Sequence, residues 1–186
     1  QQTDDIRDHM LYFLENHDEQ RVASSFFAGD ARKGVPALVV SALLQQNPLM
    51  IYFAQEYGER GMDKEGFSGN DGRTTIFDYW SVDTMVRAAH RKLTSDEKAL
   101  ATIYNKVMNI ARTEKAVSEG ASFDLMYVND QYQRQYAFLR KAGSELLLVV
   151  VNFDELPATM DVTIPAHAFD FLKIKEEKNA VAVDLL

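Results

Sequence analysis

The sequence predicts an α/β module followed by an all-β module. Two short apolar runs, 10–14 and 49–54, flank a segment, 35–46, in which apolar residues recur at the spacing of one helical face. A strand, a helix and a second strand in this order form a βαβ unit, whose two strands are expected to be parallel neighbours. From about residue 116, short apolar runs follow one another without helical segments between them. Strands connected in this way pair antiparallel.

The composition is that of a globular protein with a packed core. The chain has 186 residues, of which 46% are hydrophobic and 26% are charged, and this length suits one domain or two small ones. The formal net charge of −8 argues against nucleic acid as a partner, because nucleic-acid binding favours a basic face. An acidic chain with 11% aromatic residues suits a neutral ligand such as a carbohydrate. No cysteine is present, which excludes disulfides and thiolate metal sites, and no apolar run approaches the ~18 residues of a membrane span.

The first apolar run ends in a dense polar cluster. Seven polar residues, 15–21, follow it without a glycine or a proline, which makes an ordinary turn a poor explanation. In α/β folds the space beyond the carboxyl end of a strand is where ligands bind. Asn16, His17 and Asp18 are therefore the candidate site.

The charged residues around this cluster are expected to have supporting roles. Glu15 and Glu19 are expected to stand behind the site or to be solvated. Arg21 is expected to pair with a carboxylate, either structurally or in a ligand subsite. For His17 the alternative is an ordinary hydrogen-bonded histidine at the end of a strand.

A long polar loop follows the second apolar run. It covers 55–75 and contains five glycines, and a loop of this length in a compact domain is usually functional or mobile. Because it also leaves the carboxyl end of a strand, it is expected to lie beside residues 16–18. Its acidic residues Glu59, Asp63 and Asp71 are expected to be solvated rather than to form a metal site.

Two helices are expected between this loop and the all-β module. The first has apolar residues at helical spacing from 82 to 93. The second begins at a capping-box pattern, in which Glu97 follows Thr94 by three residues, and its apolar residues recur from 100 to 111. The α/β module is thus expected to cover 1–115.

The all-β module, 116–186, is expected to be an antiparallel β-sandwich. Turn signals separate five β-like runs, which are 122–128, 135–140, 145–153, 158–164 and 180–185. The chain ends in a strand-like segment without a closing strand, so this module is expected to be truncated.

Four stretches of the sequence resemble segments of one known family. Phe-Leu-Glu-Asn-His-Asp at 13–18 resembles the last short segment shared within that family, and 50–58 resembles its strand-eight segment, with Ala54 in place of a glycine. Gly72-Arg73 and Asp-Tyr-Trp at 78–80 resemble positions of the following loop. The family that these stretches resemble is the α-amylase family, glycoside hydrolase family 13. The resemblance implies strands seven and eight of a (β/α)8 TIM barrel with their helices, followed by the C-terminal β-sandwich domain.

The resemblance also implies roles for the candidate residues. Asp18 would be the third essential carboxylate, which holds and distorts the sugar without being the nucleophile. His17 would contact sugar hydroxyls, with Asn16 beside it in the substrate site. The loop residues with candidate substrate roles are Glu56, Tyr57 and Arg73. No cofactor is expected in this chain, since the calcium site typical of the family lies in a domain that is absent here.

The implied activity is hydrolysis of α-glucosidic bonds in starch-like α-glucans or maltooligosaccharides with retention of configuration. Retaining glycosidases use two carboxyl groups about 5 Å apart, one as nucleophile and one as acid/base. The family segments that carry these two groups are not in this sequence, so the chain alone is expected to be inactive. A non-catalytic glycan-binding or scaffold relative is the alternative, and a folded product of proteolysis is a third possibility.

Overall fold

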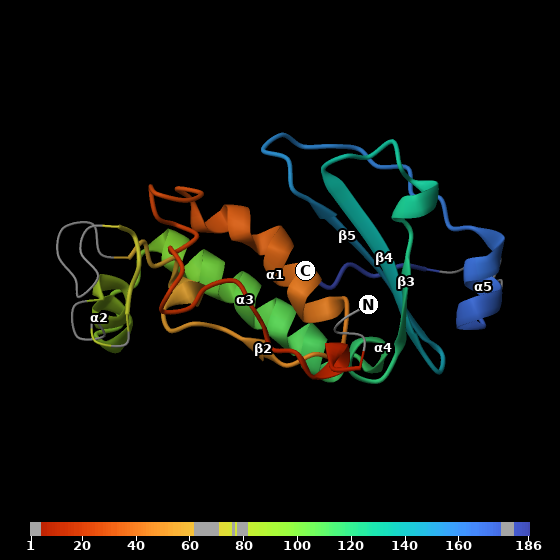
Figure 1. The fold of residues 1–186 in the computed structure, drawn as a ribbon, viewed down its shortest axis with the longest axis horizontal. Coiled ribbons are helices and arrows are strands. Elements are labelled where there is room, and N and C mark those ends of the chain that lie inside the picture. The colour runs from red at the N-terminus through yellow and green to blue at the C-terminus, as the bar shows by residue number, and fades with distance from the viewer. Residues whose placement is uncertain (1–4, 62–70, 76, 78–81, 176–180) are drawn as a thin grey trace. The chain divides into compact units, whose positions relative to one another are not determined.

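A computed structural model describes residues 5–61, 71–75, 77, 82–175 and 181–186. The chain divides into two compact units, which are described one at a time. The first comprises 1–41 and 47–105, and the second comprises 42–46 and 106–186. Figure 1 shows the labelled elements of both units along the chain. Within the described ranges, no helix is long and apolar enough to cross a membrane.

The first unit contains the predicted βαβ arrangement. β1 (Tyr12–Phe13) pairs in parallel with β2 (Leu49–Met50), and Tyr12 lies opposite Leu49. The 3-10 helix η2 (Ala31–Gly34) and helix α1 (Val35–Leu43) connect the two strands. The parallel pairing predicted from the sequence is confirmed, and α1 ends before the predicted residue 46.

Both strands are shorter than the apolar runs that predicted them. Met10 and Leu11 are exposed, so the first run is not buried throughout. The second run ends where Ala54 adopts a left-handed conformation with φ +64°, and the 3-10 helix η3 (Gln55–Tyr57) begins at the next residue. Before the two strands begin, the side chain of Asn47 donates a hydrogen bond to the Met10 carbonyl over 3.0 Å. This bond extends the contact between β1 and β2 to the residues that precede them.

Helices α2 (Asp83–Ala89) and α3 (Ser95–Thr113) follow the long loop, and the predicted capping box starts α3. The Thr94 N–H donates to Glu97 Oε2 over 2.8 Å, and the Glu97 N–H donates to Thr94 Oγ1 over 3.3 Å. Arg87 donates to the same Glu97 carboxylate from Nε over 2.9 Å. The two bonds between Thr94 and Glu97 satisfy backbone N–H groups that the start of a helix leaves unpaired, and Arg87 holds the Glu97 carboxylate in place.

The second unit is built on a three-stranded antiparallel sheet in the order β3-β4-β5 (Figure 1). The strands are β3 (Ala121–Asp124), β4 (Gln135–Ala142) and β5 (Glu145–Asn152). Ala142 lies opposite Glu145, so a two-residue turn joins β4 to β5. Three short helices accompany the sheet, namely α4 (Lys115–Ser118), the 3-10 helix η5 (Met126–Val128) and α5 (Ala166–Leu172). A short 3-10 helix of the first unit, η1 (Arg7–His9), precedes β1.

Two predicted strands of the all-β module are wrong. Residues 158–164 and 181–186 form no strand, residue 180 lies outside the described residues, and the helix α5 was not predicted. In the part of the chain that the structure describes there is one sheet in this unit, so the second sheet of a sandwich is not among these residues. The alternation at 158–164 does predict burial correctly, because Met160, Val162 and Ile164 pack on the core of Leu125, Ala137, Leu139, Ala168 and Leu172.

The buried side chain of Asn129 forms hydrogen bonds with the backbone of segment 158–164, as a neighbouring strand would. Its Nδ2 donates to the Thr163 carbonyl over 2.9 Å, and its Oδ1 accepts from the Thr163 N–H over 2.8 Å. The hydroxyl of Tyr132 accepts from the Asp161 N–H over 2.8 Å. Two side chains thus satisfy backbone groups that a strand would pair with a ladder, since buried backbone groups need partners.

The buried guanidinium of Arg140 on β4 collects carbonyl groups from helix ends. Nε donates to the Ala116 oxygen over 2.9 Å, and Nη2 donates to Val117 over 2.5 Å and to Gly120 over 2.9 Å. Nη1 donates to the carbonyl of Leu44, just beyond the end of α1, over 2.7 Å. Helices leave their last carbonyls unpaired, and one arginine satisfies four carbonyls at or near the ends of α1 and α4. Burial lowers the pKa of Arg140.

β5 exposes an apolar row along one face. Leu146, Leu148 and Val150 are all exposed, whereas Val149 and Val151 on the opposite face are buried. Leu148 and Val150 lie opposite the buried Leu139 and Ala137 of β4, so the row belongs to the same face as the core.

We expect Arg140→Lys to lower the free energy of unfolding by about 2–4 kcal/mol. The ammonium group of lysine cannot donate to all four carbonyls that the planar guanidinium of Arg140 reaches. Arg134→Lys is the matched control, since the Arg134 side chain is 68% exposed and its only ion pair among the described residues, with Asp154, is 3.7 Å long. Urea denaturation of both variants measures the difference. Equal midpoints for the two variants would contradict the role assigned to Arg140.

Candidate functional site

A buried ion pair closes the loop that follows β1. Arg21 Nη1 donates to Glu15 Oε2 over 2.8 Å, and both side chains are almost fully buried. The second carboxylate oxygen, Oε1, accepts from the Val22 N–H over 2.8 Å. Residues 16–20 therefore form a loop whose two ends are held together in the protein interior. The sequence-based expectation that Arg21 pairs with a carboxylate is confirmed.

The same guanidinium links this loop to two other segments. Nη2 donates to the carbonyl of Phe53, just after β2, over 2.9 Å, and Nε donates to Thr74 Oγ1 over 3.3 Å. The guanidinium carbon also lies 4.5 Å from the ring centre of Tyr52 and 4.9 Å from that of Phe53, within the range of cation–π attraction. One side chain thus fixes the chain beyond β1, the chain beyond β2 and the 71–75 segment.

Burial raises the pKa of Glu15 above its ordinary value of 4.5, and the charge of Arg21 and the bonds from Arg21 and Val22 oppose this shift. Charge on nearby Glu59 adds to the increase. Glu59 is itself buried and accepts from Thr84 Oγ1 over 2.5 Å, so the expectation that it is solvated is wrong. Asp63 lies outside the described residues, and no group of acidic or histidine side chains with metal-binding geometry occurs among those that are described.

Residues 71–75 dock against the candidate site through their backbone. The Gly72 carbonyl accepts from the Arg21 N–H over 2.9 Å, and the Thr74 carbonyl accepts from Tyr52 Oη over 2.8 Å. Gly72 has φ +77°, and a Cβ there would overlap Ser24 Oγ and lie 2.8 Å from Ser24 Cβ. Only glycine combines this left-handed conformation with such a close approach.

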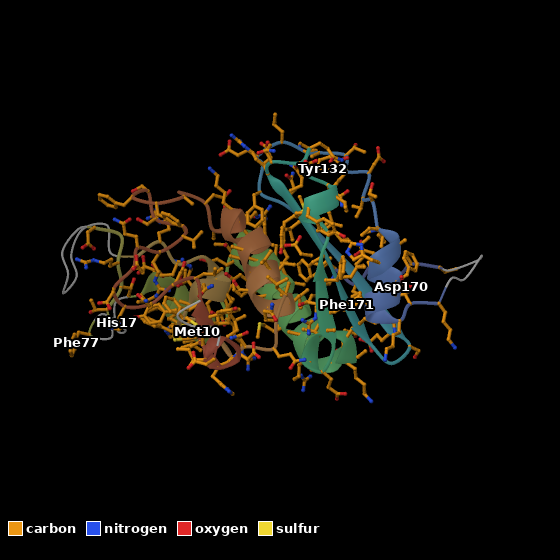
Figure 2. The ribbon with its side chains drawn as sticks, turned by 45° about the vertical axis from the view of Figure 1, so that its right-hand side comes forward. Met10, His17, Phe77, Tyr132, Asp170 and Phe171 are labelled. Carbon is orange, nitrogen blue, oxygen red and sulfur yellow. The ribbon has the colours of Figure 1, made fainter. Side chains whose placement is uncertain are left out.

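The loop exposes His17 and Asp18. The Asn16 side chain shapes it, because Oδ1 accepts from the Asp18 and Glu19 N–H groups over 2.8 Å each. His17 Nε2 lies 3.4 Å from Asp18 Oδ2, and these side chains are 58% and 74% exposed. Figure 2 labels His17 on the first unit. An imidazole and a carboxylate held side by side in solvent can together offer hydrogen bonds to hydroxyl groups of a ligand.

Arg73 is brought into the same neighbourhood. Its guanidinium is paired with Asp71, with Nη2 2.5 Å from Asp71 Oδ2. The hydrogen bond to Asp71 raises the pKa of Arg73, and the charges of Asp18 and Glu19 act in the same direction. Asp71 in turn has a lowered pKa, mainly because of its hydrogen bond to Arg73. Segment 71–75 thus lies next to the loop that carries Asp18, since the Gly72 carbonyl accepts from the Arg21 N–H.

Glu56 and Tyr57 lie on η3, and the interactions described for them join them to each other rather than to His17 or Asp18. Burial raises the pKa of Tyr57, and the charge and hydrogen bond of Glu56 add to it. Residues 78–80, which resemble positions of the loop after the strand-eight segment, lie outside the described residues.

The structural importance of Glu15 and Thr74 was missed from the sequence. The alternation of β1 gives no signal for Glu15, because it places Glu15 on the same face as the exposed Leu11 and Phe13, whereas Glu15 is buried. Nothing in the local sequence indicates a role for Thr74, whose hydroxyl accepts a hydrogen bond from Arg21, 53 residues away in the sequence.

Comparison with known proteins identifies similar folds. No protein-family model matches the sequence, and no curated protein matches it. The structure is similar to that of trehalose-6-phosphate hydrolase from Bacillus licheniformis, with 16% identity and a TM-score of 0.52 over 82% of this chain and 37% of that one. It is also similar to AmyP in complex with maltose, with 18% identity and a TM-score of 0.52 over 77% of this chain and 30% of that one. The chain thus spans about a third of these proteins and shares their fold over that part.

We expect Gly72→Ala to lower the free energy of unfolding by more than about 2 kcal/mol, since it combines a left-handed backbone with a steric overlap. Gly29→Ala separates the two causes, because Gly29 has φ +72° and no atom within 4 Å of an added Cβ. Gly29→Ala should lower the free energy of unfolding by only about 1 kcal/mol. Thermal and urea denaturation provide the measurement, and equal losses in the two variants would exclude close approach as a cause at Gly72.

The raised pKa of Glu15 makes a prediction about pH. The folded protein holds the Glu15 proton more tightly than the unfolded chain, so this residue's contribution to stability is largest below pH 4.5 and falls as pH rises through the raised pKa. The free energy of unfolding of the wild type minus that of Glu15→Gln should therefore decrease with pH in this window and become flat above it. Denaturation over about pH 4 to 8 measures this difference, and parallel profiles of wild type and variant would refute it.

Proposed function

We propose that this chain is the C-terminal part of a retaining, α-amylase-like glycoside hydrolase that acts on α-glucans or maltooligosaccharides. In this proposal residues 1–115 form the last two βα units of a (β/α)8 barrel, and 116–186 form part of a C-terminal β-sandwich domain. Asp18 is the carboxylate that binds and distorts the sugar, and His17 and Asn16 belong to the same substrate subsite. Arg73, Glu56 and Tyr57 come from the loop beyond the eighth strand.

The observation that carries the proposal is the position of His17 and Asp18 on a pinned loop beyond the carboxyl end of β1, with β2 as its parallel neighbour. Ligands bind at this edge of the sheet in β/α barrels. The fold similarity to a hydrolase and to a protein in complex with maltose supports the same assignment.

The exposed pair has the chemistry for holding a sugar rather than for attacking it. An ionised carboxylate accepts hydrogen bonds from two hydroxyls, and an imidazole can donate to or accept from a third. Such contacts stabilise a distorted sugar ring when they strengthen in the transition state. The nucleophile and the acid/base come from earlier segments of the longer protein, so the chain by itself is expected to be inactive.

We expect Asp18→Asn in the longer protein to lower kcat on maltooligosaccharides by about a hundredfold or more, as for other groups that stabilise a transition state. Glu19→Gln is the matched control, because Glu19 is an exposed carboxylate on the same turn and should retain activity within about twofold. Initial rates of reducing-sugar release measure both variants.

The same experiment decides between the hydrolase and the non-catalytic alternative. Full activity in Asp18→Asn would reject the role of Asp18. A wild type that retains maltooligosaccharides on a column but releases no reducing sugar would favour a glycan-binding or scaffold protein instead.

A further inference from the structure

A cluster of aromatic rings on the second unit takes no part in the candidate site. The ring of Phe123 on β3 has three neighbours, with centroid distances of 6.2 Å to Tyr127, 5.2 Å to His167 and 5.7 Å to Phe171. Tyr127 comes from η5, and His167 and Phe171 lie one helical turn apart on α5. Figure 2 labels Phe171 on this helix. We call these four residues the aromatic platform.

The platform is exposed in a way that core packing does not explain. Phe171 is 62% and Tyr127 is 53% exposed, so ring surface faces solvent. Exposed aromatic surface grouped in one place marks binding sites more often than single exposed residues do. Phe123, at the centre, also packs against the core of this unit, the cluster to which Leu125 and Leu172 belong. The exposed rings therefore stand on a rigid base.

The edge of the platform is polar. The Tyr127 hydroxyl lies 2.6 Å from His167 Nε2 and forms a hydrogen bond with it. This bond fixes the orientation of both rings and leaves a hydroxyl and an imidazole at the margin of an apolar surface. Apolar surface with a few oriented polar groups is the usual composition of a small-molecule site.

The size and chemistry of the platform favour a short, neutral ligand with an apolar face. Aromatic side chains bury about 150–250 Å² each, so two exposed rings offer far less than the ~800 Å² that each partner contributes to a stable protein interface. The net charge of −8 disfavours a polyanion. A pyranose ring has C–H groups on one face, which pack on an aromatic ring, and hydroxyls around its rim, which suit Tyr127 and His167.

We propose that the aromatic platform is a secondary glycan-binding surface, which takes one to three sugar units of an α-glucan outside the catalytic subsites. Phe171 and Tyr127 supply the stacking surfaces, and the Tyr127–His167 edge supplies the hydrogen bonds. This inference rests on the proposed function for the choice of α-glucan as the ligand. A surface of this kind would hold a long glucan chain to the protein while another part of the chain occupies the catalytic site.

The test compares binding to soluble starch in the full-length protein, with Asp18→Asn as the background so that the glucan is not consumed. Phe171→Ala should weaken migration retardation in native gels containing starch, with an apparent affinity about fivefold lower, as expected for loss of one stacking contact. Phe171→Trp should retain the retardation because it preserves a ring at this position. Phe27→Ala is the matched control, since Phe27 is 67% exposed and lies on the first unit.

A second measurement separates this inference from the proposed function. Hydrolysis of maltotriose by the protein with an intact Asp18 should be unchanged in Phe171→Ala, because a short substrate does not need a second surface. Retardation that is equal in Phe171→Ala, Phe27→Ala and the background protein would overturn the platform as a glycan site, whatever the hydrolysis assay shows. Loss of hydrolysis in the Asp18→Asn protein with unchanged platform binding would leave both proposals intact, whereas an inactive wild type would reject the proposed function alone.

Discussion

The guanidinium of Arg21 is the constraint on which the first unit depends. It is buried against Glu15, the Phe53 carbonyl and Thr74, and it lies over two aromatic rings. A buried ion pair is not a large source of net stability, because desolvation offsets much of its attraction. The pair instead fixes the relative positions of three segments that are distant in sequence. The chain beyond β1, the chain beyond β2 and the 71–75 segment all bind the same planar guanidinium group. The exposed residues 16–20 thereby have little freedom at either end.

The second unit uses polar side chains in a comparable way. Arg140 takes up carbonyls at the ends of helices, and Asn129 presents its amide to residue 163 as a strand would. In both cases a side chain forms hydrogen bonds with backbone groups that have no partner within a helix or sheet. Such groups are costly when they are buried without a partner, so these two residues permit short helices and irregular chain in the interior of a small unit.

Features that depend on local sequence were predicted well, and features that depend on tertiary contacts were not. The parallel pair β1–β2, the capping box at Thr94 and the β4–β5 hairpin all follow from periodicity and short-range signals. Residues 158–164 have the alternation of a strand and its burial, but their backbone partners are the side chains of Asn129 and Tyr132. Similarly, His17 and Asp18 could be selected from sequence, whereas the buried Glu15–Arg21 pair behind them depends on burial that no short pattern reveals.

The exposed apolar row of β5 has a consequence for how this unit reaches its fold. Residues 146–151 are six aliphatic residues without a charge or a proline, which is the composition of segments that stack into cross-β assemblies. Acidic residues stand only at the flanks, at Glu145 and Asp154, in the manner of gatekeepers. A hairpin closed by a two-residue turn forms in about 1–10 μs. Rapid pairing of β5 with β4 therefore occupies the backbone groups along one edge of this segment before another chain can pair with them.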